Sequence, residues 1–142
     1  MKVIIGSDHG GFNLKNKIIE YLKLNEIDVE DLGTYNTDSC DYPVIAKKVC
    51  YEVLKEDNYK GILVCGSGMG MSITANKVRG IRAALCTNEY LAKMSRKHNN
   101  TNVLCLGERV IGAGVAIDIV KTWLTTDFDG GRHEKRVSMI EG

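Results

Sequence analysis

The chain has 142 residues, of which 44% are hydrophobic and 26% charged, and its formal net charge is +1. This composition is typical of a globular domain, and the small net charge excludes a global attraction to nucleic acid or to a membrane surface. The apolar run after Met1 and Lys2 is too short for a signal peptide or a membrane span, so we expect a cytoplasmic protein.

Apolar runs and helical periodicities alternate along the chain. In order, the expected strands cover residues 2–5, 29–32, 62–65, 82–86 and 103–106. The expected helices end near residue 24, begin at Asp41 and Pro43, run from about 69 to 76, follow a cap at Thr87 or Asn88, span 113–124, and run from about 131 to 140.

This alternation of strands and helices predicts the architecture. We expect an α/β fold: a single Rossmann-like three-layer domain over residues 1–142, with a five-stranded parallel sheet and helices on both faces. The loops after the first, third and fifth strands hold most of the glycine, and they lie at the carboxyl edge where such sheets bind ligands.

Residues 61–70 carry the strongest chemical signal, because a buried strand ends in Cys65 and three alternate glycines follow it. The glycines let the backbone turn sharply and point N–H groups at a ligand, and a helix beginning near Met69 attracts negative charge. Met71 stands where a dinucleotide-binding loop needs glycine and where a cysteine phosphatase needs arginine. We therefore interpret Cys65 as a thiol base or nucleophile, with a buried core cysteine as the alternative.

The spacing of the five cysteines indicates no disulfide framework and no metal site. Five cysteines with no Cys-x-x-Cys pair fit neither a disulfide framework nor a zinc site, and we expect most to be buried apolar residues. Two roles are open for Ser67. Its hydroxyl can hydrogen-bond to Cys65 or to a substrate oxygen, or it can cap the following helix.

Two His-containing pairs are further candidates. Asp8 and His9 follow the first strand and precede two glycines, so they can contact a sugar or a phosphate or simply hydrogen-bond within the turn. His98 shares a helix face with Leu91 and Met94, which favours a core histidine, although its place beside Asn99 at the helix end leaves a functional role open.

Three arginines follow later in the chain. Arg132 and Arg136 are four residues apart and project together from the terminal helix, and Arg109 follows the fifth strand. Such a pair is often only solvated surface, but together the three would form a phosphate clamp.

Four segments of the sequence resemble type B ribose-5-phosphate isomerase, in the superfamily that also holds galactose-6-phosphate and allose-6-phosphate isomerases. The resemblance is nearly end to end. It is carried by residues 6–12 (GSDHGGF), 64–77 (VCGSGMGMSITANK), 95–104 (SRKHNNTNVL) and 130–137 (GGRHEKRV).

The resemblance implies an intramolecular aldose–ketose isomerase of the pentose phosphate pathway that needs neither a metal nor another cofactor. It assigns catalytic roles to Cys65, Ser67 and His98: Cys65 is the base that forms an enediolate, and His98 opens the furanose ring. Ser67 stands where relatives commonly have threonine. The substrate-binding set that it implies, with a phosphate clamp of one histidine and three arginines, is Asp8, His9, Gly66, Ser67, Gly68, Met69, Gly70, Asn99, Arg109, Arg132 and Arg136.

The resemblance also implies a homodimer or a dimer of dimers, with sites shared between subunits and the terminal helix, about 131–140, at the interface. Ribose 5-phosphate is the expected substrate, with a six-carbon phosphosugar as the close alternative. A non-catalytic phosphosugar sensor and a thiol redox protein are rivals from other classes. The first leaves the thiol unexplained, and the second lacks a nearby resolving cysteine.

Overall fold

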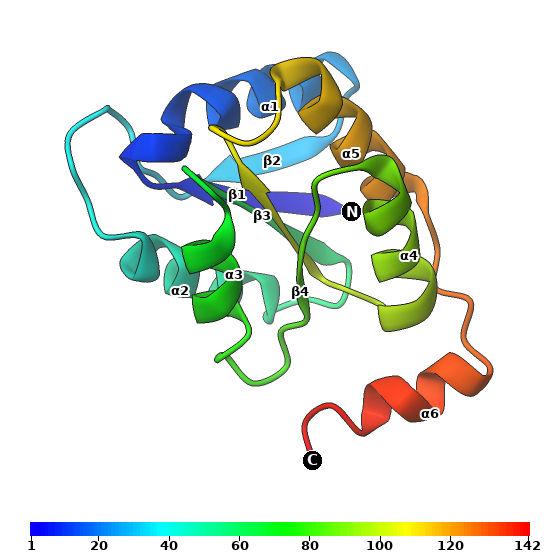
Figure 1. Cartoon of the computed structure of the whole chain (residues 1–142). Helices are drawn as coiled ribbons and strands as arrows, with labels where there is room; N and C mark the ends of the chain where they lie inside the picture. The colour runs from blue at the N-terminus through cyan, green and yellow to red at the C-terminus, as the bar shows by residue number, and fades with distance from the viewer.

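A five-stranded parallel sheet forms the centre of the protein in this computed structural model, which describes residues 1–142 (Figure 1). The strand order is β2-β1-β3-β5-β4, and every neighbouring pair is parallel. The predicted sheet is thus confirmed. The strands are β1 (Lys2–Ser7), β2 (Asp28–Asp31), β3 (Tyr59–Cys65), β4 (Ala83–Leu85) and β5 (Val103–Gly107).

Helices cover both faces of the sheet and make the three layers that the alternation predicts. One apolar cluster joins the sheet to α1, α4 and α5, and a second joins it to α2 and α3 (Figure 1). The helices are α1 (Phe12–Leu24), α2 (Tyr42–Val53), α3 (Met69–Ala75), α4 (Glu89–Asn99), α5 (Ala113–Thr125) and α6 (Arg132–Ser138), with a 3₁₀ turn η1 at His9–Gly11.

Strand β3 shows why the core divides in two. Side chains alternate across a strand, so Ile62 and Val64 face the α1 and α5 side while Leu63 and Cys65 face the α2 and α3 side. All four are buried, as expected for a central parallel strand covered by helices on both faces.

A buried lysine joins α1 to a half-buried aspartate at the end of β2. The Lys15 side chain is fully buried, and its Nζ donates to the two carboxylate oxygens of Asp31 at 2.8 and 3.0 Å. The same Nζ also donates to the Thr34 carbonyl. This pairing compensates a charge that would otherwise be costly to bury.

The expected apolar face of α4 is wrong. We expected Leu91, Met94 and His98 to share the packed face, whereas the structure buries Ala92, Ser95 and Arg96 and leaves Leu91 41% exposed. The guanidinium of Arg96 donates to the carbonyls of Thr126 and Thr101, so its burial is satisfied by hydrogen bonds. His98 is therefore not a core histidine.

The terminal helix α6 lies outside the two apolar clusters. It has no buried residue, and it extends from the body of the domain beside α4 (Figure 1). The helix ends at Ser138, slightly before the expected boundary, and Glu141 beyond it accepts a hydrogen bond from the Gly80 N–H at 2.8 Å. None of the helices has the length and apolar character needed to cross a bilayer.

Candidate active site

Two glycine-rich loops meet at the carboxyl edge of the sheet because β1 and β3 are neighbours, with Ser7 opposite Val64. The Asp8 N–H donates to the Val64 carbonyl at 3.3 Å, and the Asp8 carboxylate accepts from the N–H groups of Gly10 and Gly11. Gly11 has no room for a side chain, because a Cβ there would lie 2.5 Å from the Val64 oxygen. Glycine thus allows the Asp8 turn to approach the Cys65 loop.

Cys65 ends β3 with its side chain 5% exposed. Its Sγ accepts a hydrogen bond from the Gly68 N–H at 3.1 Å, within a turn where Gly68 has the left-handed φ of 81°. Ser67 Oγ accepts from the Met69 N–H at 3.2 Å, a local bond within the turn, while Gly68 rather than Ser67 holds the N-cap position of α3. The loop therefore folds back over the thiol that precedes it.

Several backbone donors of this loop have no partner within the protein. The N–H groups of Gly66, Ser67 and Gly70 donate to no protein acceptor. Unpaired donors beside a thiol can stabilise a developing oxyanion on a bound ligand.

A cavity of about 560 Å³ opens above the thiol and gathers most of the predicted carboxyl-edge residues. Gly68 lies behind its wall, where a Cβ would lie 2.5 Å from Leu85 Cδ1. The lining residues are Asp8, Tyr42, Cys65, Gly66, Ser67, Met69, Gly70, Ile73, Arg109 and Val110.

Arg109 supplies a positive charge to this cavity. Its guanidinium lies over Gly66, where a Cβ would be 3.1 Å from the nearest guanidinium nitrogen, and it forms no ion pair. The Arg109 N–H donates to the Gly66 carbonyl at 3.0 Å, which fixes the backbone of one loop against the other. An unpaired guanidinium in a cavity is suited to a phosphate or a carboxylate of a ligand.

Tyr42 also lines the cavity, although it was not among the predicted site residues. Its ring packs on Gly70, where a Cβ would lie 2.6 Å from Tyr42 Cε1. The available signal was its position at the start of the helix after the second strand, because that loop also reaches the carboxyl edge.

His9 follows Asp8 in the chain but is not among the residues that line the cavity. Its Nδ1 accepts a hydrogen bond from the Cys40 N–H at 3.2 Å. In the neutral ring the proton therefore resides on Nε2, which can donate to a ligand oxygen.

The remaining predicted residues lie elsewhere in the chain. Asn99, at the carboxyl end of α4, has its carbonyl 3.1 Å from Arg82 Nε, just before β4 begins, so this helix end lies at the amino edge of the sheet. None of His98, Asn99, Arg132 and Arg136 lines the cavity at Cys65 of the same chain. The structure thus divides the predicted site residues into two groups.

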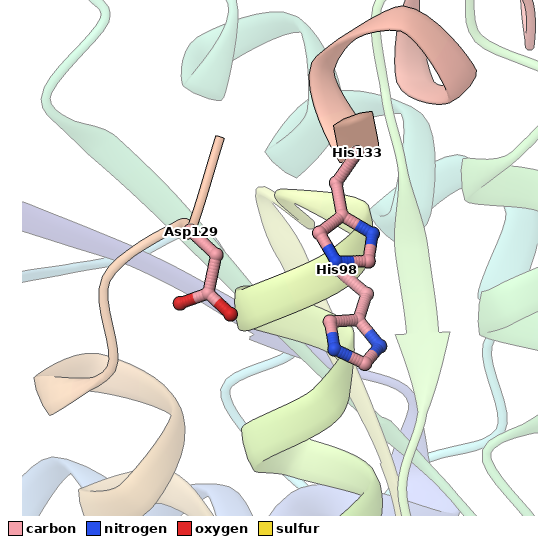
Figure 2. A group of neighbouring side chains, drawn as sticks. All are labelled: His98, Asp129 and His133. Carbon is pink, nitrogen blue, oxygen red and sulfur yellow. The ribbon is translucent and has the colours of Figure 1, made fainter. Parts of the chain in front are cut away.

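Figure 2 shows the environment of His98, which stacks on His133 from the start of α6 beside Asp129. The ring centroids are 4.2 Å apart with an interplanar angle of 12°. Partial loss of hydration lowers the pKa of His133, and the nearby His98, Arg132 and Arg136 lower it further. Arg132 and Arg136 are exposed on α6 and form no ion pair.

The other cysteines differ from Cys65. Burial raises the pKa of Cys50 to about 12 and of Cys86 to about 11, and it raises the pKa of Cys105. These thiols stay protonated at neutral pH, and none lines the cavity. The expectation that most cysteines are buried apolar residues is confirmed.

A second cavity, of about 370 Å³, lies at the amino edge of the sheet between the end of α2 and the starts of β3 and β4. Lys60, Arg82 and Arg96 line it, together with Glu56 and Asp57. Burial, reinforced by Arg96, lowers the pKa of Lys60 to about 8. This second cavity is lined by none of the predicted site residues.

Fold and site together define an α/β protein with a thiol, unpaired backbone donors and a free guanidinium in one cleft. Residues 3–140 match the Ribose/Galactose Isomerase family, and the chain belongs to this family. It is 45% identical to ribose-5-phosphate isomerase B of Escherichia coli over 139 residues, covering 98% of this chain and 93% of that protein.

Solved structures agree with this assignment. Ribose-5-phosphate isomerase B of Clostridium thermocellum is 54% identical with a TM-score of 0.96, covering 99% of this chain and 95% of that one. The Mycoplasma genitalium enzyme, solved with bound ribulose 5-phosphate, is 42% identical with a TM-score of 0.94, covering 99% and 93%. The family resemblance and the fold expected from the sequence are both confirmed.

Proposed function

We propose that this protein interconverts ribose 5-phosphate and ribulose 5-phosphate as an enzyme of the pentose phosphate pathway. The observation that carries the proposal is the cleft in which Cys65, unpaired loop N–H groups and the Arg109 guanidinium face one volume. The relatives named ribose-5-phosphate isomerase B, at 45% and 54% identity over nearly the whole chain, support this substrate.

Cys65 is the base in the proposed mechanism. The hydrogens beside a sugar carbonyl are weakly acidic, so isomerisation needs a positioned base and a preformed site for the enediolate oxygen. The Cys65 thiolate removes the proton from C2, and the resulting thiol returns it to C1. The C2 hydroxyl gives up its proton while O1 takes one, so the carbonyl moves from C1 to C2. The free N–H groups of Gly66, Ser67 and Gly70 stabilise the oxygen that becomes negative between these two steps.

The phosphate end of the substrate is bound remotely from the reacting carbons. Arg109 and Asp8 line the cavity together with Cys65, and His9 can donate from Nε2. Binding energy gained at the phosphate aligns C1 and C2 with the thiol. The proposed chemistry moves a proton between neighbouring carbons and uses no metal ion and no organic cofactor.

The second group of residues enters the site from another subunit. His98, Asn99, Arg132 and Arg136 are absent from the cavity of their own chain, and α6, which carries both arginines, has no buried residue of its own. A homodimer, alone or paired into a tetramer, would place α6 at the interface and deliver these side chains in trans. There His98 opens the furanose ring, and the arginines complete the phosphate clamp.

The first experiment follows ketose formation from ribose 5-phosphate by the metal-stripped protein. Cys65→Ala is expected to reduce turnover by roughly 10²–10⁴-fold, the usual contribution of a general base, while phosphosugar binding persists. Cys40→Ser is the matched control, because Cys40 is a partly exposed thiol outside the cavity. A fully active Cys65→Ala variant rules out the thiol base.

The same assay separates the alternatives. Turnover of allose 6-phosphate or galactose 6-phosphate with none of ribose 5-phosphate assigns a six-carbon substrate. Binding without turnover, and without exchange of solvent hydrogen into the bound sugar, assigns a sensor.

Mixing two inactive variants tests the sharing of sites. Cys65→Ala and His98→Asn each disable every site of their own homodimer. In a heterodimer with shared sites, one site receives both defects and the other receives none. Random mixing then restores about one quarter of the wild-type activity. If each site uses residues of one chain only, mixing restores nothing.

A further inference from the structure

We propose that His98, Asp129 and His133 form a binding site for a divalent transition-metal ion, best matched by Zn²⁺, and that metal bound there inhibits the isomerase. The inhibition rests on the proposed function, because it acts by occupying His98. Metal binding itself does not rest on the proposed function, and calorimetry measures it separately.

Three segments of the chain bring the ligands together (Figure 2). His98 lies at the end of α4, Asp129 in the loop after α5, and His133 at the start of α6. One donor atom of each residue, a ring nitrogen or a carboxylate oxygen, lies within 4.8 Å of the other two. Two imidazoles and one carboxylate are a common set of three protein ligands for zinc, leaving one position open.

The donors in this cluster are unused by the protein. The side chains of His98, Asp129 and His133 take part in no hydrogen bond and no ion pair, although their backbones are anchored. The Asp129 N–H donates to the Lys97 carbonyl at 3.0 Å, and the His133 N–H donates to the Gly130 carbonyl at 3.1 Å. The cluster thus has fixed attachment points and free ligand atoms.

A bound zinc ion requires the donors to move closer. Zinc–nitrogen and zinc–oxygen bonds of roughly 2.0–2.2 Å place tetrahedral ligand atoms about 3.3 Å apart. The segment before His133 can supply this movement, because Gly130 and Gly131 both have positive φ, and a Cβ on either would meet nothing within 4 Å. The stacked rings must also turn so that one nitrogen of each points at the metal.

The ligand types select the class of metal. Imidazole suits zinc, copper, nickel and cobalt, whereas Mg²⁺ and Ca²⁺ prefer sites made of oxygen ligands. Zn²⁺ and its spectroscopic substitute Co²⁺ are therefore the matched probes.

Metal binding would inactivate His98. A coordinated imidazole nitrogen has its lone pair committed to the metal and cannot exchange the proton that furanose opening requires. Zinc in this position acts as an inhibitor of the proposed isomerisation, and the thiol chemistry at Cys65 uses no metal in either state.

Binding is tested on the metal-stripped full chain by titration calorimetry with Zn²⁺ and by the visible spectrum of the Co²⁺ complex. We expect one equivalent per chain, with visible bands of an imidazole–carboxylate site and no near-ultraviolet thiolate band. His133→Gln and Asp129→Asn are each expected to weaken binding at least tenfold, since changes even to residues behind the ligands cost about 10–100-fold. The matched controls His9→Gln and Asp127→Asn retain it.

Two results overturn the metal site. One is unchanged affinity in both His133→Gln and Asp129→Asn, and the other is a thiolate band that disappears in Cys65→Ala. Inhibition is tested in the ribose 5-phosphate assay. Zn²⁺ at its binding concentration should slow the wild type and the control Asp127→Asn to the same extent. Stoichiometric binding without loss of turnover overturns the inhibition. A wild type that never turns over ribose 5-phosphate fails the proposed function, while the calorimetry still decides the metal site.

Discussion

Gly11→Ala tests whether the close approach of two loops builds the active site. A Cβ at this position would lie 2.5 Å from the Val64 oxygen, 2.6 Å from the Val64 carbonyl carbon and 2.7 Å from Val64 Cγ1. Two of these three atoms belong to the backbone of the central strand β3, so no change of rotamer relieves the overlap. The turn that carries Asp8 must instead move away from Cys65.

Overpacking of a tight site costs about 1–3 kcal/mol of stability. We expect the cost of Gly11→Ala to lie in the upper half of this range, because the added Cβ meets backbone atoms of Val64 that cannot change rotamer. Displacing positioned groups by about 1 Å can reduce catalysis by about 10²-fold. We therefore expect a free energy of unfolding lower by about 2–3 kcal/mol and a kcat/KM lower by roughly 10–100-fold.

Chemical denaturation and the ribose 5-phosphate assay measure the two effects. Gly114→Ala is the matched control, because a Cβ there meets nothing within 4 Å and the residue lies in α5. It should leave activity unchanged and stabilise the protein by up to about 1 kcal/mol through helix propensity. A Gly11→Ala protein with wild-type stability and activity would refute the reasoning.

Three further substitutions test charges in the structure. The pKa of Lys60 is about 8 in the folded protein and 10.5 in the unfolded chain. Between these pH values the folded protein binds fewer protons than the unfolded chain, so the free energy of unfolding rises with pH. Lys60→Met should remove that rise in denaturation series measured at several pH values and should stabilise the protein at pH 7 by about 1–2 kcal/mol, after discounting for the partial exposure of Lys60. Asp31→Asn leaves the Lys15 amine buried without its carboxylate and should lower the free energy of unfolding by about 3 kcal/mol; a loss under about 1 kcal/mol contradicts the pairing. Arg109→Lys replaces a planar fork by a point charge and should raise KM for ribose 5-phosphate roughly tenfold with little change in kcat; an unchanged KM removes Arg109 from the phosphate site.

The sequence predicted the sheet and the cleft because both follow from local patterns. The apolar run ending at Cys65 predicted a buried strand, and the glycines after it allow the tight turn that the structure shows. The carboxyl ends of parallel strands share one edge, which brought Asp8 and Arg109 to the same cavity as Cys65.

The burial on α4 was not predictable from periodicity. Arg96 faces inward because the carbonyls of Thr101 and Thr126 accept hydrogen bonds from its guanidinium. These acceptors lie outside α4, so the periodicity of the helix alone does not reveal them. A sequence pattern scores Arg96 as polar and Leu91 as apolar, whereas the fold buries the first and exposes the second. Tyr42 was missed for a related reason, since its role depends on the absence of a side chain at Gly70.

The division of the predicted site follows from the direction of α4. A helix that connects two parallel strands runs opposite to them, so its last residues reach the amino edge while Cys65 stays at the carboxyl edge. No rotamer of His98 or Asn99 changes the edge of the sheet at which α4 ends. A two-fold axis can place the amino edge of one chain against the carboxyl edge of another and, by the same operation, complete both sites. We therefore expect dissociation of the proposed dimer to remove turnover while each chain keeps its fold.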